Sequence, residues 1–419
     1  MKQALFAYVE AHKQELFDLL CAMIDINTEN SGKTGREKPL AELMAREFSA
    51  IGVSCDLYTP DSVEGLTSHP DYLAGRHTDE RPNITACLRG TAPRKALMLA
   101  GHLDTVPLGD EALWETPPTK GVIRNGRIYG RGACDDKFSL AVEVFLARAF
   151  RALGVPLEND VYLTGYVDEE YGGGDGALAA CVKYPCDFAI NMDSDDMDII
   201  HCGVGGQRLA LHLRHRETQD ACNDMIEAIY LTKKCIDRFG ERRRAEMAQN
   251  LYFKDTPIPQ KALRYMNVAT GLNTNDRHLG IVDFAYYTDS PREQIEAEYK
   301  ALFAEIDRVL APLSIYIEDI TYRSRFFCYA AADKQHPNIG LLGRALKAQT
   351  GKEAKVCGMC LSDLNLFINT LGGNAVSCGV CRDFSEVGGS HQPDEFVVCE
   401  DMVLFTKAII DFILEWDKI

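Results

Sequence analysis

The amino-acid sequence predicts an α/β fold in which a mostly parallel central sheet, flanked by helices, is interrupted by an inserted α+β domain. Two observations lead to this prediction. Between residues 83 and 201, apolar runs of strand length alternate with longer segments of helical periodicity, the pattern of a parallel sheet covered by helices. After residue 206 the expected order becomes strand, helix, strand, strand, helix, strand, which is that of a two-layer ferredoxin-like unit.

Each element of the first pattern follows from its own periodicity. The first 26 residues place apolar side chains at helical spacing and interrupt them with charges, which predicts an amphipathic helix and not a signal peptide. Residues 59–81 carry Pro and Gly among polar side chains and are expected to form a long loop. Strands are expected at 83–90, 96–106, 160–167 and 188–194, and a helix at 138–154.

The inserted pattern is predicted to occupy residues 207–322, between the parts of the first domain at 1–206 and 323–419. Its strands are expected at 208–215, 264–272, 277–288 and 314–323, and its helices at 223–239 and 292–310. The last part of the chain returns to the first pattern, with helices at 339–351 and 399–416 and a strand at 374–380. A chain of 419 residues is long enough for two such domains.

Composition restricts the classes of partner. The chain has 45 Lys and Arg against 62 Asp and Glu, and its formal charge of −17 has the wrong sign for binding nucleic-acid phosphates. No apolar run approaches the roughly 18 residues of a membrane span, so neither nucleic acid nor a membrane is expected as a partner. The 15 cysteines lack the dense spacing of a small disulfide-rich domain, which predicts a reducing compartment, the cytoplasm.

Residues suited to metal binding follow the predicted strands of the first domain. Taken singly, each is also compatible with a structural role, such as a helix cap or a solvated loop. Together, histidines and carboxylates at the strand ends of one sheet indicate a pair of divalent ions, and zinc is the usual choice for this mixture of ligands. The segments are His102 with Asp104, Asp135–Lys137, Asp168–Glu170, Asp193 and His391.

These segments, in this order around an inserted domain, resemble the cocatalytic zinc metallopeptidase family that includes glutamate carboxypeptidase, aminoacylase, acetylornithine deacetylase, succinyl-diaminopimelate desuccinylase and bacterial dipeptidases. The resemblance implies a zinc-peptidase-type catalytic domain with two Zn2+ per chain, for which Mn2+ or Co2+ could substitute. It also implies that Asp135 bridges the ions, that Asp104 orients His102, and that Glu169 is the general base for a metal-bridging water. The implied metal ligands are His102, Asp135, Glu170, Asp193 and His391.

The inserted domain matches the family less closely. The resemblance implies that it serves as a lid and dimerisation domain, and therefore that the chain forms a homodimer through an outer strand of this domain. The segment that carries a substrate-contacting histidine in the family is shortened here, and His212 and His215 are the expected stand-ins. Ala285 stands where most members have an arginine for a substrate carboxylate. Asn275 is a candidate lid residue, and Arg277 is a candidate replacement for the arginine.

The resulting prediction is a dizinc hydrolase that cleaves amide bonds of small substrates, such as dipeptides or the C-terminal residues of peptides. The sequence Asp-Asp-Lys at 135–137 is similar to that of the dipeptidase and carboxypeptidase branches. An N-acyl-amino-acid deacylase of the acetylornithine deacetylase type is the alternative within the family. From another class, a catalytically silent homologue that binds metal or peptide is a further alternative, although Glu169 and the implied ligands are present.

Two Cys-x-x-Cys pairs, Cys357/Cys360 and Cys378/Cys381, give a competing signal. Four cysteines at such spacing can hold a structural zinc or act in redox chemistry. A chain with 15 cysteines also contains such pairs by chance, and Cys378 and Cys381 fall on a segment expected to be a buried strand. The sequence therefore favours core or pocket-lining thiols over a four-cysteine zinc site.

Overall fold

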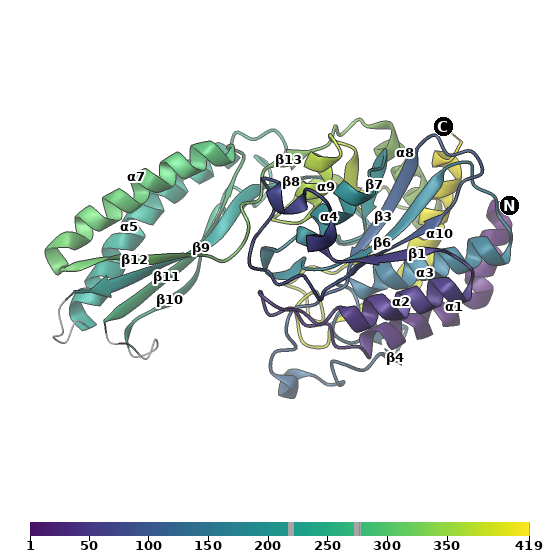
Figure 1. Cartoon of the computed structure of the whole chain (residues 1–419), viewed down its shortest axis with the longest axis horizontal. Coiled ribbons are helices and arrows are strands. Elements are labelled where there is room, and N and C mark those ends of the chain that lie inside the picture. The colour runs from purple at the N-terminus through teal and green to yellow at the C-terminus, as the bar shows by residue number, and fades with distance from the viewer. Residues whose placement is uncertain (217–221, 272–275, 277, 419) are drawn as a thin grey trace. The chain divides into compact units, whose positions relative to one another are not determined.

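The computed structural model describes residues 1–216, 222–271, 276 and 278–418, which form two compact units (Figure 1). The first unit comprises Met1–His201, Ala331–Cys357 and Leu366–Ile419, and the second comprises Cys202–Ala330 and Gly358–Asn365. The predicted inserted domain, residues 207–322, lies within the second unit, which also includes the segment Gly358–Asn365. Hydrogen bonds join this segment to the rest of the second unit, since the Val204 N–H donates to the Met359 carbonyl (3.3 Å) and the Asn365 side-chain Nδ2 donates to the Val204 carbonyl (2.9 Å).

The main sheet has a parallel centre, which confirms the predicted α/β class. Strand β3 runs parallel to β6 and β7, and β15 runs parallel to β7, whereas β1 and β2 are antiparallel to their neighbours. The strand order is β1 (Cys55–Tyr58), β2 (Asn83–Leu88), β6 (Asp160–Tyr166), β3 (Ala96–His102), β7 (Phe188–Asn191), β15 (Ala375–Ser377), β8 (Ile199–Gly203) and β13 (Ala330–Ala331), with β14 (Val356–Met359) paired to β8.

Helices cover this sheet. Helix α3 contacts β3, α1, α2 and α10, which explains why nearly all its side chains are buried. Figure 1 shows α1, α2 and α3 side by side. The helices are α1 (Lys2–Ile24), α2 (Lys38–Ala50), α3 (Lys137–Ala152), α4 (Asp175–Lys183), α8 (Pro337–Thr350), α9 (Leu364–Thr370) and α10 (Cys399–Trp416).

A small antiparallel sheet completes the first unit. Its strand order is β16 (Phe396–Val398), β5 (Arg127–Tyr129) and β4 (Val122–Arg124). The predicted loop at 59–81 contains two short 3₁₀ helices, η1 (Pro60–Ser62) and η2 (Leu66–Ser68). Within the part of the chain that the structure describes, none of the helices combines the length and apolar character that crossing a bilayer requires.

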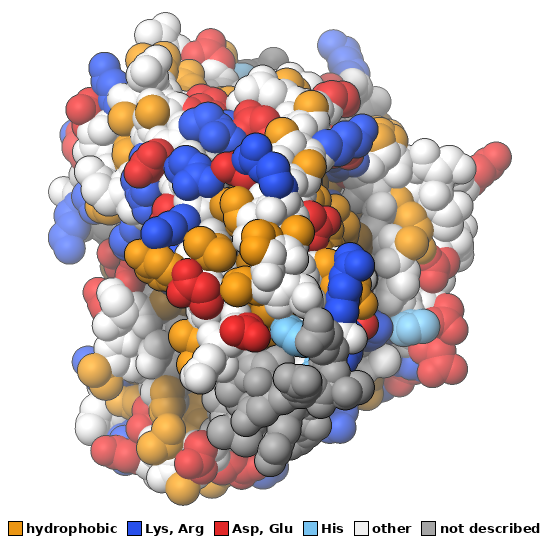
Figure 2. Space-filling model, turned by 90° about the vertical axis from the view of Figure 1, so that its left-hand side faces the viewer, with side chains coloured by type: hydrophobic (Ala, Val, Ile, Leu, Met, Phe, Trp, Pro, Cys, Tyr) orange, Lys and Arg blue, Asp and Glu red, His pale blue; other side chains and the backbone are white. Residues whose placement is uncertain are grey.

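The second unit has the ferredoxin-like arrangement that the order of its elements predicts. Helices α5 (Cys222–Met247) and α7 (Arg292–Leu310) connect strands of an antiparallel sheet and share a core with it. The sheet order is β10 (Leu263–Ala269), β11 (Leu279–Thr288), β9 (Gly205–His215) and β12 (Ile315–Tyr322). Figure 2 shows basic side chains with acidic ones among them on the face that it views. Ion pairs such as Arg238–Glu305 (2.6 Å) join the two helices.

Candidate metal centre

The predicted ligands lie where strands of the main sheet end or where a helix begins. His102 is the last residue of β3, while Glu170 and Asp193 follow β6 and β7. Asp135 lies just before α3, and His391 lies in the loop before β16. Because β3, β6 and β7 are parallel neighbours, their carboxyl ends bring segments that are distant in sequence to one edge of the sheet.

Three of these side chains form a close, buried group. One ligand atom from each of His102, Asp135 and Glu170 lies within 4.8 Å of the others. His102 Nε2 is 2.9 Å from Asp135 Oδ1. His391 Nε2 is 3.1 Å from Asp135 Oδ2 and 3.2 Å from Glu170 Oε1. Asp135 therefore presents one carboxylate oxygen to each histidine.

The electrostatics of this group are those of a cation site. Burial acts to lower the pKa of His102, but the carboxylates of Asp104 and Asp135 raise it well above its usual value. In the same way, Glu170 and Asp135 raise the pKa of His391 against the effect of burial. The carboxylates thus hold positive charge on the imidazoles, and a metal ion would supply that positive charge in their place.

Asp193 is partly buried and interacts with a thiol. Cys381 Sγ donates to Asp193 Oδ1 at 3.6 Å. Burial and then the negative charge of Asp135 raise the pKa of Asp193 to about 6. Asp193 is not one of the three residues of the close group, but its electrostatic interaction with Asp135 puts it in the same acidic environment.

The structure gives Asp104 a contact that differs from the expected one. His102 Nδ1 lies 2.9 Å from the Asp104 carbonyl oxygen and 3.6 Å from the carboxylate Oδ1, so the backbone holds the imidazole more closely. The carboxylate instead accepts from the backbone N–H groups of Glu169 (3.1 Å) and Glu170 (3.0 Å). Asn30 Nδ2 also donates to it at 2.8 Å. Asp104 therefore fixes both the segment of the proposed base and that of a proposed ligand.

A buried arginine pair that the sequence analysis missed holds the start of this segment. Asp168 has a φ of +66° and accepts from Arg76 Nη2 (2.7 Å) and Arg81 Nη1 (3.0 Å). Arg81 Nε also donates to both oxygens of Glu37 at 3.0 Å. Arg76 lies in the loop predicted at 59–81, and the length of that loop was the one signal of a role.

The structure separates the candidate substrate residues of the second unit. His212 and His215 are three residues apart on β9 and so face opposite sides of the sheet. His215 is buried on the side of α5, 3.7 Å from Asp224, whereas His212 is half-buried and 3.0 Å from Thr321 Oγ1. Asn275 and Arg277 lie outside the described residues.

Two arginines flank Ala285 in the sheet. Arg208 on β9 and Arg264 on β10 are its direct cross-strand partners. Arg208 donates to both carboxylate oxygens of Asp283, at 3.0 and 2.8 Å, while Arg264 is exposed. The family resemblance implies an arginine at the position of Ala285. Among the described residues, Arg208 and Arg264 are the arginines directly opposite that position.

The paired cysteines are free thiols with local contacts. Cys378 Sγ donates to the Met197 carbonyl at 3.8 Å, and Cys381 donates to Asp193. Among the described residues, His102, Asp135 and Glu170 form the one group of His, Cys, Asp and Glu spaced as metal ligands. This supports the interpretation of the cysteines as core or pocket-lining thiols.

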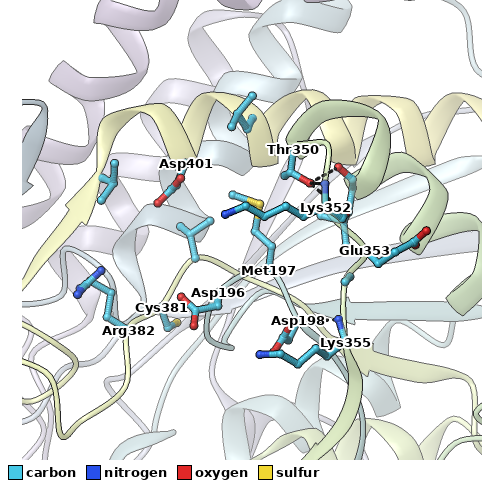
Figure 3. A pocket seen from close by; sticks show the side chains of 15 residues that line it. Asp196, Met197, Asp198, Thr350, Lys352, Glu353, Lys355, Cys381, Arg382 and Asp401 are labelled. Atoms are coloured by element: carbon cyan, nitrogen blue, oxygen red, sulfur yellow. Dashed lines mark hydrogen bonds and ion pairs between the residues drawn. The ribbon is translucent and has the colours of Figure 1, made fainter.

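Cys381 also lines a cavity of about 420 Å³ in the first unit. Figure 3 shows that acidic and basic side chains surround it together, with Asp196 and Asp401 near Arg382 and with Lys352 from the opposite wall. Cys381 therefore both lines this cavity and contacts Asp193.

Comparison with known proteins identifies the family. The family described as Peptidase family M20/M25/M40 matches residues 98–415. The chain is 26% identical to the N-formyl-4-amino-5-aminomethyl-2-methylpyrimidine deformylase of Bacillus subtilis (strain 168), over 97% of this chain and 96% of that protein. It is 25% identical to the succinyl-diaminopimelate desuccinylase of Polynucleobacter necessarius subsp. necessarius (strain STIR1), over 86% of this chain and 90% of that protein.

Solved structures share the fold of this chain. The solved structure of the di-peptidase Dug1p from Saccharomyces cerevisiae superposes with a TM-score of 0.77 at 15% identity, covering 100% of this chain and 99% of that one. This similarity shows the shared fold, and the family match covers most of the chain. The resemblance inferred from the motifs is thereby confirmed: the chain belongs to peptidase family M20/M25/M40 and is an enzyme of the metallopeptidase and amidohydrolase type.

Proposed function

We propose that this enzyme is a two-zinc amide hydrolase that removes small acyl groups from N-acylated amines. The observation that carries the proposal is the geometry of Asp135, whose two carboxylate oxygens each face a histidine, at 2.9 and 3.1 Å. A carboxylate between two imidazoles is suited to bridging two divalent ions. Mixed imidazole and carboxylate ligands are typical of zinc.

The donor set fits such ions. His102 and Asp135 would hold the ions together with Glu170, Asp193 and His391, all of which belong to the first unit. Carboxylates gathered in a buried site need positive charge, and the described groups that face them are imidazoles. When bound, divalent ions supply Lewis acidity, which lowers the pKa of water and polarises an amide carbonyl.

The chain itself supplies the proton transfer. Glu169 is partly buried and adjoins Glu170, so one backbone segment carries a proposed ligand and a proposed base. The hydrogen bonds from both backbone N–H groups to Asp104 fix that segment. Glu169 accepts a proton from the attacking water and passes it to the leaving amine, which is the role of a general base and then of a general acid.

Two observations support an acyl amine as the substrate. Ala285 provides no charge for a substrate carboxylate, and the neighbouring Arg208 is engaged by Asp283. The two curated relatives described above, aligned over most of their length, are named as a deformylase and a desuccinylase, both of which remove acyl groups. A peptide substrate with a free carboxylate would need another cation.

A substrate panel tests the proposal. We expect enzyme loaded with zinc, manganese or cobalt to hydrolyse N-formyl, N-acetyl or N-succinyl amines with a kcat/KM at least about tenfold above that for dipeptides, a difference of about 1.4 kcal/mol in transition-state binding. A preference for dipeptides would overturn the deacylase assignment. Hydrolysis of no amide at all would overturn the proposed function and favour a silent homologue.

A dipeptidase or carboxypeptidase is the second candidate. It is favoured by exposed Arg264, which lies opposite Ala285 and is a candidate to receive a carboxylate. Comparing each active peptide with its C-terminal amide tests this, because a lost charge-assisted hydrogen bond costs about one to two decades in affinity. An unchanged kcat/KM for the amide would show that the enzyme does not recognise the substrate carboxylate.

The cytoplasmic location of the protein remains a prediction.

A further inference from the structure

Arg131 and Glu395 form a buried ion pair next to the proposed metal centre. Arg131 Nη1 lies 2.5 Å from Glu395 Oε2, and the two side chains are 5% and 0% exposed. The small antiparallel sheet brings these residues together, since β5 leads into Arg131 and Glu395 leads into its partner strand β16. The Gly130 N–H also donates to the Glu395 carbonyl at 2.9 Å.

Each residue of the pair reaches from one ligand segment to the backbone of the other. Arg131 precedes Asp135 on the chain, and its Nη2 donates to the carbonyl of His391 at 3.4 Å. Glu395 follows His391, and its Oε1 accepts from the backbone N–H groups of Cys134 (3.1 Å) and Asp135 (3.2 Å). The ion pair therefore ties together the backbones of two proposed ligands in both directions.

We infer that Arg131 and Glu395 are positioning residues that set the separation of Asp135 and His391 for binding two metal ions. This inference rests on the proposed function. The functional atoms of the two tied residues, Asp135 Oδ2 and His391 Nε2, are 3.1 Å apart. His391 has a φ of +64°, which a residue other than glycine adopts when surrounding contacts hold it, and the bond from Arg131 to its carbonyl is one such contact.

The charges of the pair suit this role. Arg131 and Glu395 are oppositely charged, so together they add no net charge to a site that already gathers carboxylates. The ring of Trp114 lies 5.1 Å from Arg131 Cζ and covers the guanidinium. A buried ion pair made by the forked donors of an arginine keeps a fixed geometry, whereas an ion pair on the solvated surface does not.

The variants E395Q and R131K test the inference through metal binding. E395Q keeps the length and an acceptor oxygen but loses the charge that holds Arg131. R131K keeps the charge but loses the forked donors that reach His391 and Glu395 together. We expect each variant to bind divalent zinc about 10- to 100-fold more weakly than the wild type, which is the typical effect of losing a residue that supports a ligand. Competition with a chromogenic chelator measures the affinity of both sites without substrate.

The second unit offers a matched control. Glu246 accepts from the backbone N–H groups of Asp289 (2.7 Å) and Ser290 (2.8 Å) and pairs with Arg243 at 2.9 Å. E246Q therefore removes a similar, partly buried interaction in a unit that holds none of the proposed ligands. We expect E246Q to bind zinc as the wild type does, and thermal unfolding of each variant shows that it is folded.

The outcomes separate this inference from the proposed function. Weaker zinc binding in folded E395Q or R131K, with E246Q unchanged, supports the positioning role. Zinc affinities within about twofold of the wild type in both folded variants overturn it, as does an equal loss in E246Q. A wild type that binds two ions but hydrolyses no amide overturns the proposed function and leaves the positioning role standing. A wild type that binds no divalent ion overturns both.

Discussion

Substitutions of the neighbouring residues Glu169 and Glu170 are expected to affect different properties of the enzyme. Glu170 Oε1 contacts His391 Nε2 at 3.2 Å and accepts from the Val106 N–H at 3.1 Å, so its carboxylate belongs to the ligand group. Glu169 is the proposed general base, and its carboxylate acts on water rather than on the ions. We expect E169Q to keep its metal and to lose about two to four decades of kcat, whereas E170Q loses metal. Elemental analysis alongside kcat checks both results, and near-normal turnover in E169Q would exclude Glu169 as the base.

Glu143 on α3 gives a pH-dependent prediction. Its side chain is fully buried. Burial, and next the charge of Asp136, raise its pKa well above the usual value. The folded state therefore keeps a proton that the unfolded state releases above about pH 4.5, and stability falls as pH rises, by at most about 1.4 kcal/mol per unit.

E143Q removes this titration while keeping the shape of the side chain. We expect E143Q to gain stability over the wild type, and the gain to grow as pH rises from 5 to 8, because only the wild type loses the contribution of Glu143 as pH rises. Chemical denaturation at several pH values measures the difference. A change at exposed Glu42, E42Q, is the control. A difference that stays constant with pH would contradict the prediction.

At the scale of residues, the sequence indicated candidate site residues within short segments, but not the partners that contact them from distant parts of the chain. Four of the proposed ligands could be proposed from the sequence because His102 ends a strand, Glu170 and Asp193 closely follow strands, and Asp135 closely precedes a helix, whereas His391 stands in a long loop before β16. Their supports could not, since Asn30 and Arg76 meet their partners Asp104 and Asp168 across 74 and 92 residues. The pairing of Arg131 with Glu395 spans 264 residues and has no signal in either segment.

At the scale of elements, the sequence predicted those strands and helices whose apolar residues recur with a clear period. The strands β2, β3, β6 and β7 and the order of the second unit were predicted from apolar runs and helical spacing. Helix α4 was missed because seven of its residues, Asp175–Cys181, are buried together, so no apolar stripe stands out from a polar one. Strands β4 and β5 have three residues each, too few for a period.

Helix α2 could have been predicted from the sequence. Leu40, Met44 and Phe48 are spaced by one helical turn, and all three are buried.

Strand β10 leads to a prediction about assembly. It is an edge of the second unit's sheet, and Met266 and Val268 on it are 45% and 48% exposed. An edge strand with apolar side chains and unpaired backbone groups is a template for another strand. We expect two copies of the chain to pair through β10, and V268K to weaken the dimer more than about tenfold, because a charged side chain must be desolvated there.

Sedimentation at several protein concentrations measures this association. The matched control is I226K on α5, where Ile226 is 60% exposed in the same unit but away from a sheet edge. We expect I226K to associate as the wild type does. A monomeric wild type, or equal association of all three proteins, would show that β10 is not the dimer interface.

At the scale of the whole molecule, the proposed metal site belongs to one of the two units. All the proposed ligands lie in the first unit, although Asp193 and His391 are separated along the chain by the whole second unit. Parallel strands β7 and β15 bring the two flanking segments back together, since Ala375 pairs with Ala189. The second unit folds around its own core of β9, β11, α5 and α7. Metal binding should therefore stabilise one unit and not the other.

The position of the tryptophans makes this division measurable. The chain has two tryptophans, Trp114 and Trp416, and both lie in the first unit. An ion at 100 times its Kd stabilises the state that binds it by about 2.7 kcal/mol. We expect a chelator to lower the unfolding temperature seen by tryptophan fluorescence by about 5 °C, as the size of the unit implies. Circular dichroism, which reports on both units, should retain a second transition that the chelator does not move. The fluorescence shift should disappear in D135N, which lacks the proposed bridging carboxylate, and a chelator shift of equal size in both transitions would mean that the units unfold together or that the ions are bound elsewhere.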